Sequence, residues 1–228
     1  MAESIVRRVN VGYRVFGQAI NSDANPRRRA YINELGFRIF TASIAQGVVK
    51  RPDPAPSDLA RLEEETAFFI SRLRARDEFT APTVPEREEA LTLSRQLYRY
   101  FLIHGGDGTI DAAPHFAGCG IVNTCVGDLI SQPTLYEVKA GARDFRLVDI
   151  RQVVTYCALN FASRQYVIDR VVLINPRRGI FAEIDIHADI SRASGLSASE
   201  VYSQLLDFMS QDLSQGDLTR RPRTIPSF

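Results

Sequence analysis

Two carboxylates and a lysine occupy two neighbouring segments that have the alternating pattern of β-strands. Asp128 stands in the first segment, and Glu137 and Lys139 stand in the second, with Gln132-Pro133 between them. If Gln132-Pro133 forms a two-residue hairpin loop, Asp128 lies directly opposite Glu137. Side chains alternate along a strand, so Lys139 lies on the same face as Glu137. The spacing predicts a cluster of two carboxylates and one ammonium group.

Such a cluster has a specific chemistry. Two carboxylates about 5 Å apart repel each other by roughly 3 kcal/mol at an effective dielectric constant of about 20. A divalent cation between them removes this repulsion, and oxygen ligands favour Mg²⁺ or Mn²⁺ with positions left for water and a substrate phosphate. Lys139 then orients or helps to deprotonate the attacking water and offsets charge in the transition state. The alternative is a surface pair of Glu137 and Lys139 with Asp128 out of register, because longer loops shift the pairing.

The lysine at position 139 is unusual for this chain. Of the 28 basic residues, only Lys50 and Lys139 are lysine, and the others are arginine. Lysine is a compact, movable point charge, whereas arginine is a planar fork. The pattern indicates a chemical requirement for an ammonium group at position 139.

Composition narrows the class of protein. The 228 residues are 45% hydrophobic and 24% charged, which is typical of one large globular domain or two small ones. The net charge of +1 means that any basic surface for nucleic acid is local. No apolar run approaches the roughly 18 residues of a membrane span, and the N-terminus lacks a signal sequence, so we expect no membrane partner and a cytoplasmic location. Three cysteines at irregular spacing predict neither a disulfide framework nor a zinc site.

The first part of the chain has helical character. Two proline-rich stretches, 51–57 and 77–85, read as linkers. Three segments have apolar residues at helical spacing: 31–49, 58–76 and 86–103. We therefore expect a helical N-terminal portion over 1–85, whose role is open between a substrate clamp, a surface for a second copy and a docking face for a protein partner.

After residue 104 the pattern changes to short strands. The predicted strands are 115–122, 125–130, 134–140, 166–174 and 180–186. The predicted helices are 149–161 and one that begins at a capping box of Ser197 and Glu200. The order predicts a mixed α/β core over 86–215, followed by a basic tail over 216–228.

Three short motifs in this region resemble those of the PD-(D/E)XK nuclease superfamily, the restriction-endonuclease-like fold. They are Gly127-Asp-Leu-Ile130, Thr134-Leu-Tyr-Glu-Val-Lys-Ala140 and Gln152-Val-Val-Thr-Tyr156. The last is similar to the Q-x3-Y motif of the RecB and lambda-exonuclease branch. The resemblance covers about residues 86–190 and implies an αβββαβ core. The proline of the family motif is displaced, since Pro133 lies in the loop.

The resemblance implies a role for each residue of the cluster. Asp128, Glu137 and the backbone carbonyl of Val138 bind Mg²⁺ or Mn²⁺, and Lys139 is the catalytic lysine. Members of the family often add a glutamate from the helix that precedes the strands, for which Glu89 is our candidate among several.

Gln152 and Tyr156 position the substrate or the active-site elements if the resemblance holds. Each also has a structural interpretation. Gln152 follows Asp149 by three residues and closes a capping box if Asp149 is the N-cap. Tyr156 is then a core residue with its hydroxyl at the rim.

Three arginines between the strand of Glu137 and the following helix are candidates for substrate phosphate contacts. They are Arg143, Arg146 and Arg151. Solvated surface arginines are the alternative.

The function expected from these features is Mg²⁺-dependent hydrolysis of phosphodiester bonds, with DNA favoured as substrate and RNA still open. Two alternatives remain: a nucleic-acid-binding module of the same fold without turnover, and a metal-dependent hydrolase of a small phosphorylated substrate. A role in genome defence is suggested only by the family's habits.

Overall fold

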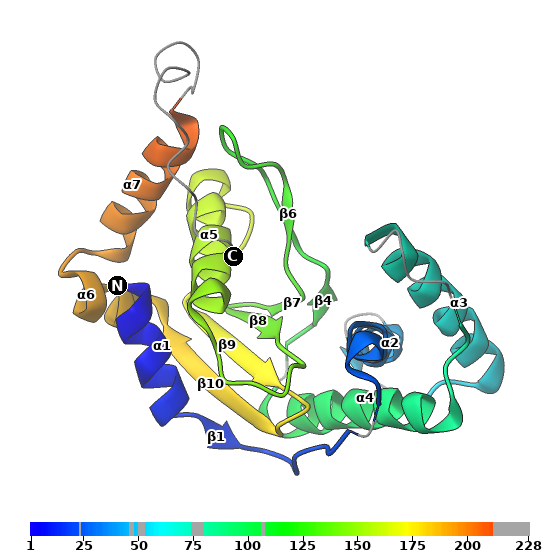
Figure 1. The fold of residues 1–228 in the computed structure, drawn as a ribbon. Coiled ribbons are helices and arrows are strands. Elements are labelled where there is room, and N and C mark those ends of the chain that lie inside the picture. The colour runs from blue at the N-terminus through cyan, green and yellow to red at the C-terminus, as the bar shows by residue number, and fades with distance from the viewer. Residues whose placement is uncertain (23, 46–47, 50–52, 74–79, 106–107, 212–228) are drawn as a thin grey trace, which may run out of the picture.

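A six-stranded mixed sheet carries the segments with the predicted motifs. The computed structural model describes residues 1–211 except 23, 46–47, 50–52, 74–79 and 106–107 (Figure 1). The sheet order is β1 (Arg14–Val15), β10 (Ile180–Asp185), β9 (Arg170–Asn175), β8 (Thr134–Val138), β7 (Leu129–Ser131) and β4 (Asp111–Ala112). Strands β8 and β9 run parallel, and the other neighbours run antiparallel. The prediction of a mixed α/β protein is confirmed.

Helices cover both faces of this sheet. They are α1 (Ala2–Val11), α2 (Arg29–Ala42), α3 (Pro56–Leu73), α4 (Val84–His104), α5 (Leu147–Ser163), α6 (Ile186–Ser194) and α7 (Ala198–Ser210). Alternation along β8 separates two cores: Leu135 packs with α1 and α5, and Tyr136 packs with α4. A third apolar cluster joins α2, α3 and α4. Figure 1 shows α2 between α3 and the sheet edge formed by β4 and β7.

The N-terminal portion is divided between two parts of the fold. Ile5 and Val9 on α1 belong to the core on the α5 face, and β1 pairs with β10. Only α2 and α3 form the helical assembly that packs on α4. The helix α4 contributes to this assembly and to the sheet core at once, so it connects the two. The tail 216–228 lies outside the described residues.

Several predicted elements are confirmed in position. The observed α3, α4 and α5 overlap the predicted helices 58–76, 86–103 and 149–161, although residues 74–76 lie outside the described part of the chain. Ser197 and Glu200 form the predicted capping box of α7. Periodic apolar residues and local caps are the signals that act within one helix.

The predicted helix over 31–49 is wrong in its second half. The helix α2 ends at Ala42, and two short strands, β2 (Ile44–Ala45) and β3 (Val48–Val49), pair after it. At the end of α2, the N–H and the hydroxyl of Ser43 both donate to the carbonyl of Phe40. The β-branched residues that follow favour extended backbone.

The predicted strands 115–122 and 125–130 are each interrupted. His115–Phe116 (β5) pairs with Cys125–Val126 (β6) in a small ladder separate from the main sheet, whereas Leu129 and Ile130 belong to β7 of the main sheet. Gly120 has φ +56° and lies so close to Met209 that a Cβ atom has no room. The N–H of Gly127 bonds to the carbonyl of Pro114. Between β6 and β7 the chain leaves the small β5–β6 ladder and enters the six-stranded sheet.

The last two predicted strands are shorter than expected. The side chain of Asn160 bonds both the N–H and the carbonyl of Tyr166, so residues before Arg170 form a loop. The second strand ends at Asp185, whose side chain accepts a hydrogen bond from the N–H of Ala188 and caps α6. The helix α6 was not predicted.

Within the described part of the chain, no helix has the length and apolar character that a membrane crossing requires.

Candidate active site

The hairpin of β7 and β8 has the predicted pairing register. Leu129 pairs with Tyr136, and the pairing continues to Ser131 and Thr134 across the two-residue loop. The ladder stops before Asp128, so Asp128 and Glu137 are not a strand pair. Instead, the side chain of Asp128 accepts a hydrogen bond from the Val138 N–H at 2.6 Å. This bond keeps the Asp128 carboxylate beside β8.

Lys139 connects the strand to helix α5. Its Nζ lies 2.5 Å from Oε1 of Glu137 and donates to Oε1 of Gln152 at 2.8 Å. Its backbone N–H donates to the carbonyl of Ile174, which extends the parallel pairing with β9. The side chain of Glu137 is 2% exposed and that of Lys139 is 17% exposed. The pair is therefore not the surface pair of the alternative interpretation.

Gln152 and Tyr156 extend this chain of hydrogen bonds. The amide of Gln152 donates to the Tyr156 hydroxyl at 2.7 Å, and this hydroxyl donates to the carbonyl of Val126 at 3.0 Å. The Tyr156 ring stacks on Phe116, with 5.1 Å between centroids. Burial, with the charge of Glu137 adding to it, raises the pKa of Tyr156 to about 12, so the phenol stays a donor.

The capping interpretation of Gln152 is wrong. The helix α5 begins at Leu147, and Asp149 accepts from the N–H of Arg146, the N-cap. Asp149 is therefore the third residue of the helix, and Gln152 stands one turn further along. Because α5 begins two residues before Asp149, Gln152 is not part of the cap, and its side chain bonds to Lys139 instead.

One carboxylate oxygen of the cluster has no partner. Among the described residues, Oε2 of Glu137 is buried and accepts no hydrogen bond. Burial and the nearby charge of Asp128 raise the pKa of Glu137 to about 8, although Lys139 acts in the opposite direction. Burial also raises the pKa of Asp128, against the Val138 N–H and Lys139. A buried acceptor without a donor costs about 1 to 3 kcal/mol, and a cation bound to this oxygen would remove that cost.

A third carboxylate belongs to this region and was missed in the sequence. The charge of Glu34 on α2 contributes to the raised pKa of Asp128, and the Glu34 side chain accepts from Arg38 at 2.8 Å. The only local signal is the i, i+4 spacing of Glu34 and Arg38 on one helix face. That signal does not say which strand the helix faces.

The donor set fits a hard divalent cation. Glu137 offers its unpartnered oxygen, and no hydrogen bond in the described residues engages Oδ1 of Asp128. The N–H and C=O of a strand residue point to the same edge, so the Val138 carbonyl points to the side where its N–H meets Asp128. No group of three or more His, Cys, Asp or Glu side chains suited to a metal occurs within the described residues. A cation here would therefore complete its shell with the carbonyl and water, as Mg²⁺ does.

Glu89 is engaged in a different buried pair. One of its oxygens lies 2.6 Å from Arg177, and the other accepts from Ser22. Arg177, on the turn between β9 and β10, is 2% exposed and also donates to the carbonyl of Ala140 and to Asn33. The structure thus does not bring Glu89 into the Asp128 and Glu137 cluster. Arg177 thus connects Asn33 on α2 and Glu89 on α4 to the sheet.

The three arginine candidates have different surroundings. Arg143 makes a bidentate pair with Asp149, at 2.7 and 2.9 Å, which organises the start of α5. Arg146, the N-cap of α5, and Arg151, in its second turn, are exposed. No contact in the described residues tests the role of Arg146 or Arg151, so both stay predicted phosphate contacts.

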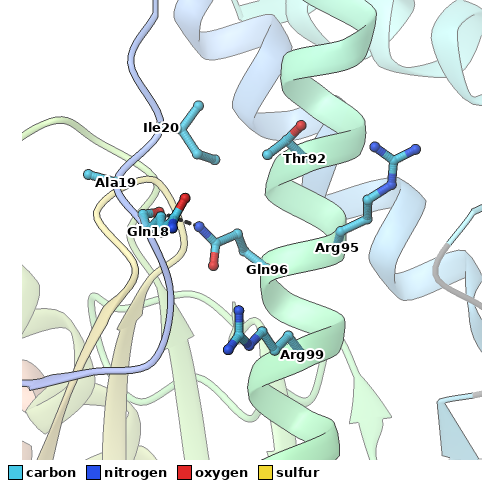
Figure 2. Close-up of a pocket in the computed structure, with 7 residues that line it drawn as sticks. All are labelled: Gln18, Ala19, Ile20, Thr92, Arg95, Gln96 and Arg99. Carbon is cyan, nitrogen blue, oxygen red and sulfur yellow. Dashed lines mark hydrogen bonds between the residues drawn. The ribbon is translucent and has the colours of Figure 1, made fainter.

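A separate cavity of about 320 Å³ opens between α4 and the segment that follows β1. Figure 2 shows Arg95 and Arg99 on α4 on one side of it and Gln18 on the other, with Gln96 donating to the Gln18 carbonyl. Arg95 already pairs with Asp53. No lining residue belongs to the cluster on β8.

Comparisons with known proteins add no relative. No protein-family model matches the chain, and searches of curated proteins and of solved structures find no match either.

Proposed function

We propose that this chain is a Mg²⁺- or Mn²⁺-dependent nuclease that hydrolyses phosphodiester bonds, with DNA as the expected substrate. The observation that carries the proposal is the unpartnered, buried Oε2 of Glu137 in a cluster with Asp128 and Lys139. An ordinary buried ion pair satisfies both carboxylate oxygens, whereas this one leaves an oxygen for a cation.

The order of elements supports a restriction-endonuclease-like core. After α4, the strands β4, β7 and β8 of one sheet are followed by α5 and then by β9, parallel to β8. This is the αβββαβ order that the sequence resemblance implies. The three motifs stand on β7, β8 and α5, where their side chains meet.

Each residue of the cluster has a separate role in the proposed hydrolysis. In the reaction, the oxygen of water forms a bond to phosphorus, the ester P–O bond breaks, and the leaving oxygen takes a proton. A divalent cation supplies charge stabilisation for the phosphate and a lower pKa for water. Glu137, Asp128 and the Val138 carbonyl hold the cation, and Lys139 stabilises charge on the phosphate oxygen and orients the water. Gln152 fixes the Lys139 ammonium, and Tyr156 fixes Gln152.

The test is cleavage of plasmid, linear duplex, single-stranded DNA, RNA and nucleotides with Mg²⁺, Mn²⁺ or EDTA. We expect Mg²⁺-dependent cleavage of DNA by the wild type and none by Glu137→Gln. Glu183→Gln is the matched control, because Glu183 is also a strand glutamate paired with a basic residue, Arg14, in the same sheet.

The outcome separates the three functions. Cleavage of nucleotides alone would favour the hydrolase of small phosphorylated substrates. Binding of DNA with no cleavage in either metal would favour the module without turnover. Equal cleavage by Glu137→Gln and wild type would contradict the assigned site.

A further inference from the structure

Two exposed phenylalanines stand on α3, the helix that packs against α2. Phe68 is 67% exposed and Phe69 is 38% exposed. The guanidinium of Arg38 lies 4.8 Å from the centroid of the Phe69 ring, and that of Arg72 lies 5.8 Å from the Phe68 ring. Single exposed apolar residues are common, but two adjacent rings that each carry an arginine are a distinct surface.

Arg38 on α2 contacts both the Phe69 ring and Glu34. Its guanidinium donates to Glu34, whose charge acts on Asp128. The helix α2 that carries both residues lies between α3 and the sheet edge (Figure 1). A nucleic acid strand that extends from Asp128 across α2 would therefore reach α3, the helix that carries Phe68 and Phe69.

The charges of α3 confine this surface to one end of the helix. Its acidic residues, Asp58 and the run Glu63-Glu-Glu65, repel a phosphate backbone, and all of them precede Phe68. The last eight residues of the helix, 66–73, carry Phe68, Phe69 and Arg72 without an acidic residue. Polyanion binding is thus favoured at this end of α3 and not over its acidic run.

We propose that Phe68 and Phe69, with Arg38 and Arg72, form a stacking platform for the unpaired bases of a single-stranded nucleic acid. The proposal rests on the proposed nuclease function and adds the class of substrate. Bases stack on aromatic rings and on guanidinium planes, and arginines neutralise the adjoining phosphates. In a duplex, each base face is covered by its neighbours, so these rings select a single strand or an unpaired end.

The absence of tryptophan from the chain gives a direct probe of stacking. The variant Phe68→Trp places a single tryptophan on the platform, and Phe208→Trp places one at a matched site, because Phe208 on α7 is 66% exposed. Without divalent cations, an oligothymidylate of about 20 nucleotides should quench the emission of Phe68→Trp. It should leave Phe208→Trp unchanged, and a blunt duplex should quench neither variant.

Affinity measurements separate stacking from apolar contact. Fluorescence anisotropy with the same labelled oligothymidylate should show binding weakened on the order of tenfold by Phe68→Ala. Phe68→Leu keeps an apolar side chain without an aromatic face, and it should also bind more weakly than wild type. Equal affinity of wild type and Phe68→Leu, or quenching of both tryptophan variants alike, would overturn the platform.

The two proposals fail separately. If the wild type cuts DNA with Mg²⁺ but oligothymidylate does not quench Phe68→Trp, the platform is wrong and the nuclease stands. If quenching occurs but no substrate is cut with either metal, the platform stands as a binding site and the catalytic proposal is wrong. Absence of quenching is also the result expected if a protein partner or a membrane covers these rings.

Discussion

Glu137 and Asp149 are two carboxylates of almost equal burial whose surroundings differ in kind. Their side chains are 2% and 3% exposed. Both oxygens of Asp149 accept from Arg143, and one also accepts from the N–H of Arg146. Within the described part of the chain, one oxygen of Glu137 accepts from Lys139 and the other accepts no hydrogen bond. Both oxygens of Asp149 therefore have donors, whereas one oxygen of Glu137 has none among these residues.

The pKa values of the two groups move in opposite directions for this reason. Burial raises the pKa of each, but the hydrogen bonds from Arg143 and the Arg146 N–H outweigh burial and hold the pKa of Asp149 below its usual range. For Glu137, burial and Asp128 prevail over Lys139. Equal burial therefore does not make the two carboxylates alike, and the proposed role of Glu137 depends on its incomplete hydrogen bonding rather than on its burial.

The largest effect should come from the lysine that holds Glu137. In Lys139→Arg, a bulkier, permanently protonated guanidinium replaces a point charge, and we expect the rate of DNA cleavage to fall by about 10² to 10⁴. Circular dichroism should show a folded protein. The other lysine of the chain provides the control, because Lys50→Arg makes the same change elsewhere. Cleavage by Lys139→Arg within a few-fold of wild type would remove the main support for the assignment.

Metal binding should distinguish Asp128, a proposed metal ligand, from Asp149, whose oxygens are both hydrogen-bonded. At a concentration 100 times its dissociation constant, Mg²⁺ stabilises the folded state by about 2.7 kcal/mol. We therefore expect Mg²⁺ to raise the melting temperature of wild type and of Asp149→Asn, although Asp149→Asn has the lower melting temperature without metal. Mg²⁺ should not raise the melting temperature of Asp128→Asn. Differential scanning fluorimetry with and without EDTA measures it. Equal shifts in wild type and Asp128→Asn would contradict the site.

Gln152 tests whether the hydrogen-bond chain beyond Lys139 matters. Gln152→Ala frees the ammonium without removing it, so cleavage should fall on the order of tenfold while the free energy of unfolding changes by about 1 kcal/mol. Thr155→Ala on the same helix removes a bond from Thr155 to the carbonyl of Arg151 and serves as the control. A Gln152→Ala variant with lowered stability and normal turnover would make Gln152 structural only.

The smallest effect concerns Asp149 and pH. Since its folded pKa is lowered, its ionised form adds stability above the unfolded value of about 3.9, and this contribution is lost as the pH falls through the folded value. The stability advantage of wild type over Asp149→Asn in urea should therefore shrink as pH is lowered below about 4. An advantage that grows in acid would show that Arg143 does not stabilise the carboxylate.

Much of the cluster could be predicted because its signals are local. The two-residue loop determined the register of β7 and β8, and the alternation of side chains placed Glu137 and Lys139 together. Asp128 was predicted as a strand partner, but it leaves the ladder and reaches β8 through its side chain. The spacing of Gln152 and Tyr156 showed that they share a helix face, although not which residue the face meets.

By itself, the sequence determined the helices α3 to α5, the hairpin of β7 and β8, and the chemical types gathered on β8, since these depend on periodicity and on residues a few positions apart. Only the tertiary structure decided which distant groups join them. Glu34 near Asp128, Arg38 on Phe69 and the buried pair of Arg177 with Glu89 come from elements far apart in the chain. Their contacts depend on how α2 packs against α4 and the sheet, and no local pattern of charges specifies that packing.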